Sequence, residues 1–194
     1  MKVALFGGTF DPVHTGHLLI AESARGQLGL DRVIFLPTAI PPHKRKPKAD
    51  ARHRLAMLRL AIRGNPAFEV SDWELSQKRI VYTYESLDHF APRFGGGKCG
   101  FIVGSDSLSM VPHWRRGPEL LKRVRFLAVE RPGTPWNRLP ARLRRRARLI
   151  ASPTVPFSSA DIRRRMRRRQ SVRYQVPEAV ERYMRRHRLY RAHA

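Results

Sequence analysis

Four short and continuously apolar runs constrain the fold of this chain more than any other feature. They are KVALF (2–6), RVIFLP (32–37), CGFIVG (99–104) and RFLAVE (125–130). Such runs are typical of strands that are buried on both faces, as in a parallel sheet covered by helices. The sequence therefore predicts an α/β fold, a parallel sheet with helices on both faces.

Helices and loops are expected between these runs. Residues 17–28 carry apolar side chains at helical spacing, and Asp50 is placed to cap a second helix that ends before 64–66. Residues 68–75 look like a strand. Thr83 is then placed to cap a helix that runs to about residue 90, with Glu85 in its first turn.

The alternation continues to the C-terminus. A helix is expected after Gly104, another over 117–124, and a last strand at LIASP (149–153). SSADIRRRM and PEAVERYMRRHRLY, the latter with Pro177 in its first turn, predict a small C-terminal helical portion. Since no boundary in composition divides the chain, residues 1–194 are predicted to form a single domain.

Composition narrows the class of protein. With 42% hydrophobic residues the chain is expected to be globular, and no apolar run approaches the roughly 18 residues of a transmembrane helix. Cys99 is the single cysteine, which excludes an intrachain disulfide and a thiolate metal cage. The first apolar run is too short for a secretion signal. These features predict a cytoplasmic protein with no membrane partner.

The formal net charge of +24 is concentrated late, in RLRRRARL (142–149) and RRRMRRR (163–169). A charge of this size suits a polyanionic partner, either a nucleic acid or a phosphorylated small molecule. We interpret most of the two runs as solvated helix faces, because the sequence has no zinc-finger spacing and no RNP motif. A basic nucleic-acid-binding protein is kept as the alternative of another class.

The stretch GGTFDPVHTGH (7–17) joins the first apolar run to the first helix. Gly7 and Gly8 let the backbone approach a phosphate closely, and Thr9 adds a hydroxyl. His14 and His17 are three residues apart, so they are expected to share one face of a helical turn. Three interpretations of the two histidines are open: metal binding, catalysis, or packing in the core. Their place after a glycine-rich strand end favours function, and the lack of a third ligand at a fitting spacing disfavours metal.

Two later segments also follow apolar runs, where ligands of open α/β sheets bind. In GSDSL (104–108), Asp106 is placed to bind a ribose or to orient a histidine, although Ser105 or Asp106 would also suit a helix N-cap. In SSADIR, Ser158 and Ser159 open a helix whose N-terminal amides favour anions, with Arg163 one turn in. Ordinary capping explains these serines equally well.

Two single residues have open interpretations. Lys44, in the proline-rich PPHK, is either a solvated lysine or a cation that closes over a phosphate. Trp114, in HWRRG, either stacks on a ring of a ligand or packs in the core. The stretch GGGKCG (95–100) lacks the ending of a Walker A loop, and we interpret it as a turn.

Taken together, GGTFDPVHTGH, PPHK, VSDWEL, YTYESL, FIVGSDSL, HWRRG and SSADIR resemble one family, the bacterial nicotinate-nucleotide adenylyltransferases of the HxGH nucleotidyltransferase superfamily. The resemblance runs from Met1 to about Tyr190. It implies a Rossmann-like fold and the reaction of ATP with nicotinate mononucleotide to deamido-NAD and pyrophosphate, in NAD biosynthesis. A relative that uses nicotinamide mononucleotide or another phosphate acceptor is the alternative.

The resemblance also implies residue roles. His14, His17, Lys44 and Arg163 are the implied catalytic residues, all acting on phosphates, with His17 most directly on the reacting region. The implied ATP site adds Gly7, Gly8, Thr9, Phe10, Asp106, Ser158 and Ser159. The implied nicotinate mononucleotide site contains Lys44, Tyr82, Thr83, Asp106, Trp114 and Arg131. No protein metal ligand is implied, because Mg²⁺ arrives with ATP.

The chain departs from the family pattern at three positions. Arg79 and Val81 stand where the family usually has Gly and Ser before its Tyr-Thr pair. The missing hydroxyl leaves the nicotinate carboxylate to the backbone amides of Tyr82 and Thr83. Arg169 replaces a usual Gly near the C-terminus, which makes the turn geometry there a question for the structure.

Overall fold

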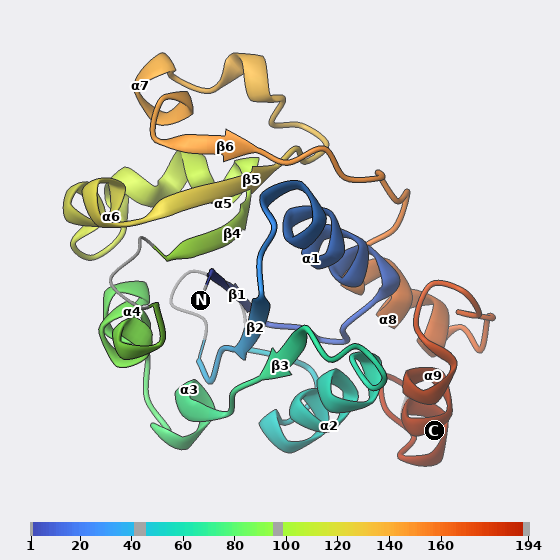
Figure 1. The fold of residues 1–194 in the computed structure, drawn as a ribbon. Helices are drawn as coiled ribbons and strands as arrows, with labels where there is room; N and C mark the ends of the chain where they lie inside the picture. The colour runs from blue at the N-terminus through green and yellow to red at the C-terminus, as the bar shows by residue number, and fades with distance from the viewer. Residues whose placement is uncertain (1, 41–45, 95–98, 192–194) are drawn as a thin grey trace.

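The computed structural model describes residues 2–40, 46–94 and 99–191, and within these ranges six parallel strands form one sheet. In sheet order the strands are β3 (Phe68–Val70), β2 (Arg32–Pro37), β1 (Val3–Gly8), β4 (Gly100–Gly104), β5 (Arg125–Val129) and β6 (Ala147–Leu149). This is the strand order of a Rossmann-like sheet, so the predicted fold class is confirmed. The order reverses between β1 and β4, which pair directly (Figure 1).

Helices cover both faces of the sheet, as predicted (Figure 1). One face carries α1 (Thr15–Leu28), α2 (Ala51–Ala61), α8 (Ser159–Arg167) and α9 (Glu178–Arg186). The other carries α4 (Thr83–Phe90), α5 (Ser105–Met110) and α6 (Gly117–Arg123). The short helices α3 (Trp73–Ser76) and α7 (Ala141–Arg144) and three 3-10 turns, 91–94, 111–113 and 136–138, lie in the connections.

Each of the four central strands, β2, β1, β4 and β5, contributes to two hydrophobic cores, one on either face of the sheet. In β1, Ala4 and Phe6 belong to one core and Val3 and Leu5 to the other. Successive side chains of a strand point to opposite faces, and here both faces are covered. The strands therefore appear in the sequence as continuous apolar runs rather than as alternating ones.

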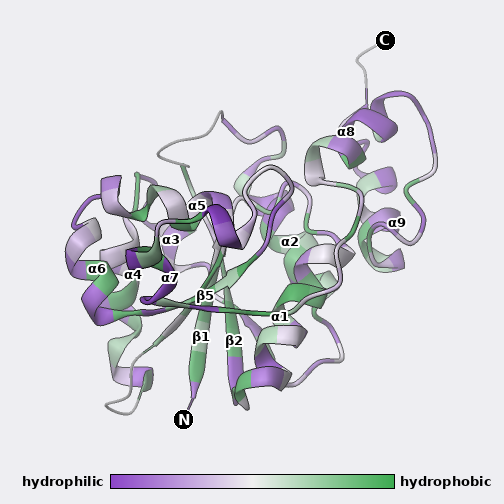
Figure 2. Ribbon diagram, turned by 90° about the horizontal axis from the view of Figure 1, so that it is seen from above, coloured by the Kyte–Doolittle hydropathy of each residue, from purple (hydrophilic) through white to green (hydrophobic). Residues whose placement is uncertain are grey.

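The predicted C-terminal helical portion is present as α8 and α9. Ile162, Met166, Val180 and Met184 pack onto the core that contains α1 and α2. The outer faces are hydrophilic, and Figure 2 shows these two helices at one side of the molecule, away from the apolar strands. Most arginines of 163–169 are exposed, as expected of a solvated helix face.

Two of the predicted strands have the wrong bounds. Strand β3 covers only 68–70 of the predicted 68–75, because the Ser71 Oγ accepts a hydrogen bond from the Trp73 N–H at 3.2 Å and the chain turns into α3. The last strand is 147–149 rather than 149–153. As an edge strand it pairs through its backbone with β5, so the charged Arg148 belongs to it.

Several predicted helix caps are off by one residue. Tyr82 rather than Thr83 is the N-cap of α4, and Gly104 rather than Ser105 is the N-cap of α5. The N-cap is the last residue with extended backbone, and ψ is 151° at Tyr82 and 157° at Gly104. Pro177 is likewise the N-cap of α9 and not part of its first turn.

Candidate active site

A cavity of about 970 Å³ opens at the carboxyl ends of β1 and β4, where the strand order reverses. Every predicted site residue in the described ranges lines it: Gly7, Gly8, Thr9, Phe10, His14, His17, Tyr82, Thr83, Asp106, Trp114, Arg131, Ser158, Ser159 and Arg163. Lys44 lies outside the described residues. The topology therefore brings segments from most of the length of the chain to one place.

The two histidines of the first motif lie against each other. His14 is the N-cap of α1, and its backbone N–H donates to the Nδ1 of His17 at 3.2 Å. The ring centroids are 3.7 Å apart, so the expectation of a shared face is confirmed. A neutral His17 that accepts at Nδ1 carries its proton on Nε2, which makes Nε2 a hydrogen-bond donor.

Gly16 makes this arrangement possible. A Cβ at Gly16 would lie 2.7 Å from the Cγ2 of Val155 and 3.0 Å from the Nδ1 of His14. Carbon atoms that are not bonded to each other pack at about 3.5–4.0 Å, so a side chain here would displace both neighbours. The glycine between the histidines thus clears the space in which the His14 ring packs.

His14 is buried, with 3% of its surface exposed. Burial and, to a smaller extent, the charge of Arg131 lower the pKa of His14 to about 4, so the ring is neutral at pH 7. Within the described part of the chain its Nδ1 has no hydrogen-bond partner. A neutral, incompletely satisfied histidine beside a cavity favours a ligand-binding role over simple packing.

The end of β4 forms the wall of the cavity beside Asp106 and Arg131. A Cβ at Gly104 would collide with Asp106 and would lie 2.9 Å from the Cγ of Arg131, so glycine allows both side chains to approach. The Ser105 hydroxyl donates to the Thr134 carbonyl at 2.6 Å and accepts from the Arg131 N–H at 2.9 Å. Ser105 therefore fixes the 131–134 turn at the cavity instead of capping α5.

Aromatic and cationic side chains line a second part of the cavity. Tyr82 and Thr83 come from the start of α4, and Trp114 follows the 3-10 turn 111–113. Trp114 is half-buried against one hydrophobic core, so the packing interpretation is confirmed, and it also lines the cavity, where ring stacking stays a prediction. The Arg115 guanidinium lies 4.9 Å from the centroid of the Tyr82 ring, a cation–π distance.

Glu74 is a buried acid in the same part of the cavity. Its side chain comes from α3, is 7% exposed and accepts a hydrogen bond from the Ser86 hydroxyl at 2.7 Å. Burial raises the pKa of Glu74 to about 7, the hydrogen bond from Ser86 opposes this, and the nearby Glu85 adds to it. The cavity therefore holds a carboxyl group that titrates near neutral pH.

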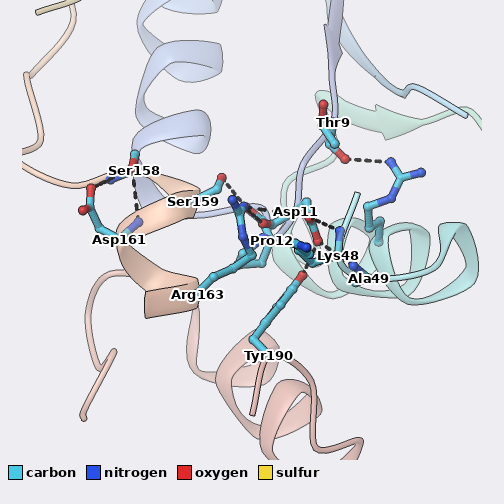
Figure 3. Close-up of polar contacts among 11 residues, drawn as sticks. Thr9, Asp11, Pro12, Lys48, Ala49, Ser158, Ser159, Asp161, Arg163 and Tyr190 are labelled. Carbon is cyan, nitrogen blue, oxygen red and sulfur yellow. Dashed lines mark hydrogen bonds and ion pairs between the residues drawn. The ribbon is translucent and has the colours of Figure 1, made fainter. Parts of the chain in front are cut away.

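Helix α8 is joined to the loop between β1 and α1 that ends at His14 (Figure 3). Ser158 is the N-cap of α8 and forms a reciprocal capping box, which matches the capping interpretation. The Ser159 hydroxyl donates to the Pro12 carbonyl at 2.9 Å. Arg163 Nη1 donates to the Asp11 carbonyl at 2.6 Å. Ser159 and Arg163 thus hold the loop against α8 at the edge of the cavity.

Two further properties bear on the sequence predictions. Among the residues that the structure describes, no three histidine, cysteine, aspartate or glutamate side chains gather as a metal site. In the same ranges no helix is long and apolar enough to cross a membrane.

Comparison with known proteins identifies the family. A family model described as cytidylyltransferase-like matches residues 5–165. A protein of Symbiobacterium thermophilum with the name "Probable nicotinate-nucleotide adenylyltransferase" is 45% identical, over 97% of this chain and 95% of that protein. This chain belongs to the nicotinate-nucleotide adenylyltransferase family. A relative of the same name from Exiguobacterium sibiricum is 43% identical, over 93% of this chain and 94% of the relative.

Solved structures agree with the fold. The nicotinic acid mononucleotide adenylyltransferase of Plasmodium falciparum, complexed with NaAD, superposes with a TM-score of 0.81 over 97% of both chains. At 18% sequence identity this likeness shows the fold and not the substrate. It supports the Rossmann-like sheet of this member of the adenylyltransferase family.

The departures from the family pattern have local explanations. Arg79 forms an ion pair with Glu85 at 2.7 Å, and Glu85 in turn accepts from the Tyr82 N–H at 2.8 Å. The Tyr82 amide, one of the two donors expected for the nicotinate carboxylate, is therefore already bonded. Val81 is buried and lines the cavity as an apolar residue. Arg169 has φ of 57°, so the left-handed turn typical of glycine persists without glycine.

Residues that the sequence analysis did not single out complete this adenylyltransferase site. Asp11 and Glu74 line the cavity. Both lie inside motifs quoted above, FDP and SDWEL, and this position is the sequence signal that could have identified them. Lys46 and Lys48 line it from the segment that follows the prolines. Arg54 is buried in α2, and nothing in the sequence around it indicates its contact with the Thr9 carbonyl at 2.7 Å.

Proposed function

We propose that this protein transfers AMP from ATP to nicotinate mononucleotide, which gives deamido-NAD and pyrophosphate in NAD biosynthesis. It does so as a single domain, residues 1–194, in the cytoplasm. The observation that carries the proposal is the meeting of the implied ATP and mononucleotide residues around one cavity of about 970 Å³. Membership of the nicotinate-nucleotide adenylyltransferase family supports the same reaction.

The reaction requires positioning more than proton transfer. The phosphate of the mononucleotide has a second pKa of about 6, so it is mostly a dianion at pH 7 and needs no strong base. One of its oxygens attacks the α-phosphorus of ATP. The bond from this phosphorus to the oxygen that bridges to the β-phosphate breaks, and pyrophosphate leaves. The protein must align the two substrates and neutralise the charge on the phosphates.

Donors around the first motif bind ATP in this proposal. His14 and His17 contact the phosphates, with His17 nearest the reacting α-phosphate, and the neutral state of His14 suits a hydrogen-bond donor. Ser158, Ser159 and Arg163 bind phosphates from α8. A guanidinium has five N–H donors, so the bond of Arg163 to the Asp11 carbonyl is compatible with a phosphate contact.

The backbone of the same motif binds the nucleotide. Gly7, Gly8, Thr9 and Phe10 line the nucleotide site, and Asp106 lies on the ribose side. Lys44 is proposed as a further contact to the phosphates of both substrates. The glycines permit close approach of a ligand to the strand end.

The second part of the cavity binds the mononucleotide. Tyr82, Thr83 and Trp114 frame the nicotinate ring and its carboxylate, and Arg131 binds on the phosphate side. Because the Tyr82 amide is bonded to Glu85, the backbone contact to the carboxylate falls to Thr83. The acid, rather than the amide, is the expected substrate.

Magnesium enters as part of the substrate, the complex of Mg²⁺ with ATP. The acids that line the cavity in the described ranges are Asp11, Glu74 and Asp106. The Asp11 carboxylate already accepts hydrogen bonds from the protein, and Glu74 is buried. These acids therefore do not form a set of oxygen ligands for a resident Mg²⁺. The ion, bound by the ATP phosphates, neutralises charge on the leaving pyrophosphate.

Pyrophosphate release from ATP and nicotinate mononucleotide tests this function. His17→Ala is expected to lower kcat by a factor of about 10²–10³, the usual cost of losing one hydrogen-bond donor to a reacting centre. Its circular dichroism spectrum is expected to match that of the wild type. His187→Ala, a histidine at the end of α9 outside the cavity, is the control and should turn over normally. Undiminished turnover in His17→Ala would refute the role of His17.

A substrate panel decides between the related reactions. The proposal requires a higher kcat/KM for nicotinate mononucleotide than for nicotinamide mononucleotide. A higher value for the amide would reassign the substrate. Binding of a nucleic acid with a steep dependence on salt, together with no turnover of ATP, would favour the alternative class.

A further inference from the structure

The loop between β1 and α1, residues 9–14, is held in place by side chains of distant segments, which donate hydrogen bonds to its backbone carbonyls (Figure 3). The Thr9 carbonyl accepts from Arg54 at 2.7 Å. The Asp11 and Pro12 carbonyls accept from Arg163 and Ser159, as described above. This histidine loop therefore takes its conformation from α2 and α8 and not from its own residues alone.

The carboxylate of Asp11 adds a second set of contacts. It is 4% exposed and accepts three hydrogen bonds: from the Lys48 N–H at 2.7 Å, from the Ala49 N–H at 3.1 Å and from the Tyr190 hydroxyl at 2.7 Å. Burial, together with the adjacent Asp11, raises the pKa of Tyr190. The Tyr190 hydroxyl therefore stays protonated and donates to Asp11 throughout the neutral range.

These contacts connect two walls of the cavity. Asp11 belongs to the histidine loop, and residues 46–48 form a second segment that lines the cavity. Asp11 accepts from the backbone at the end of this segment, and Tyr190 contacts the same carboxylate from beyond α9. The segment that follows α9 thus reaches the loop beside the active site through the Tyr190 hydroxyl.

We propose that Asp11 and Tyr190 are a positioning pair for the transfer reaction. Tyr190 holds the Asp11 carboxylate in the orientation that accepts the Lys48 and Ala49 amides, and this sets the distance between the histidine loop and the segment 46–48. The inference rests on the proposed function, because the benefit of this geometry is alignment of the two substrates. Small misplacements at a reacting centre cost up to about 100-fold in rate.

Tyr183 offers a matched control. It lies in α9, and its hydroxyl is 3.0 Å from the Nδ1 of His53 in α2. Like Tyr190, it joins the C-terminal portion to the rest of the protein through a phenolic hydroxyl, but it does not contact the histidine loop. Loss of either hydroxyl removes one docking contact, and only the loss at 190 disturbs Asp11.

The first experiment compares Tyr190→Phe with Tyr183→Phe in the full chain, by steady-state kinetics and thermal unfolding. Tyr190→Phe is expected to lower kcat about 10-fold or more, with KM for nicotinate mononucleotide within about twofold. Tyr183→Phe is expected to lower the melting temperature to a similar extent and to leave kcat unchanged. Equal losses of kcat in both variants would mean a purely structural role and would overturn the proposal.

A double-mutant cycle tests whether the two residues act together. If Tyr190 acts through Asp11, Asp11→Ala combined with Tyr190→Phe has the same kcat as Asp11→Ala alone, because alanine removes the acceptor of the Tyr190 hydroxyl. Multiplying losses would contradict a positioning pair.

Limited trypsin digestion supplies a readout that does not depend on activity. Cleavage after Lys48, followed by mass spectrometry, should be faster in Tyr190→Phe than in Tyr183→Phe, because the Lys48 and Ala49 amides lose their oriented acceptor. Equal cleavage in the two variants would overturn the inference. If the wild type released no pyrophosphate but this difference in cleavage were present, only the proposed function would be refuted.

Discussion

Replacing Glu74 with glutamine is expected to stabilise this protein at pH 8 and to have little effect at pH 4.5. Glu74 is 7% exposed, and burial raises its pKa from 4.5 to about 7. Each pKa unit is worth about 1.4 kcal/mol, so the ionised carboxyl costs about 3 kcal/mol of unfolding free energy once both states are deprotonated. Glutamine removes this cost, because it carries no charge.

The direction with pH follows from proton binding. Between pH 4.5 and about 7 the folded protein keeps a proton on Glu74 that the unfolded chain has released. The unfolding free energy of the wild type therefore falls as pH rises through this window, and the part due to Glu74 is fully lost above it. Glutamine still accepts the hydrogen bond from Ser86 through its amide oxygen, so the contact with α4 is kept.

Urea unfolding of the wild type and Glu74→Gln at both pH values measures the effect. Glu85→Gln is the control of opposite sign, because its hydrogen bond from Arg79 lowers the pKa of Glu85, so that its ionised form stabilises the fold. Glu85→Gln should therefore destabilise the protein at pH 8. An equal change for Glu74→Gln at both pH values, or destabilisation at pH 8, would refute the reasoning.

Two other perturbations test the site and the C-terminal turn. The pKa of His14, lowered to about 4, predicts a neutral His14 ring in nuclear magnetic resonance spectra down to about pH 5. The unfolding free energy is expected to fall as pH falls from 6.5 towards 4. A titration midpoint of His14 near 6.5 would contradict this. Arg169→Gly should raise the unfolding free energy by up to about 1 kcal/mol, because φ is 57° there. Arg168→Gly, at φ of −84°, should lower it, and equal effects of the two substitutions would argue against strain at 169.

The buried strands were predictable because a strand covered on both faces needs an apolar side chain at nearly every position. Prediction of the strand bounds failed at the edge of the sheet and at a turn, where this requirement does not apply. Strand β6 lies at the edge and depends on backbone pairing, so its charged Arg148 carried no strand signal. The turn at Ser71 depends on one side-chain hydrogen bond to Trp73, which apolar spacing does not encode.

The motifs around His14, Asp106 and Ser158 also pointed to phosphate chemistry from the sequence alone, because glycines, helix starts and basic residues are local features. Only the tertiary structure decided how they meet. The hydrogen bond between Tyr190 and Asp11 spans 179 residues of sequence, and the burial that raises the pKa of Glu74 comes from packing. Local spacing determines which side chains share a strand or a helix face. The order of the strands determines which of those faces enclose one cavity.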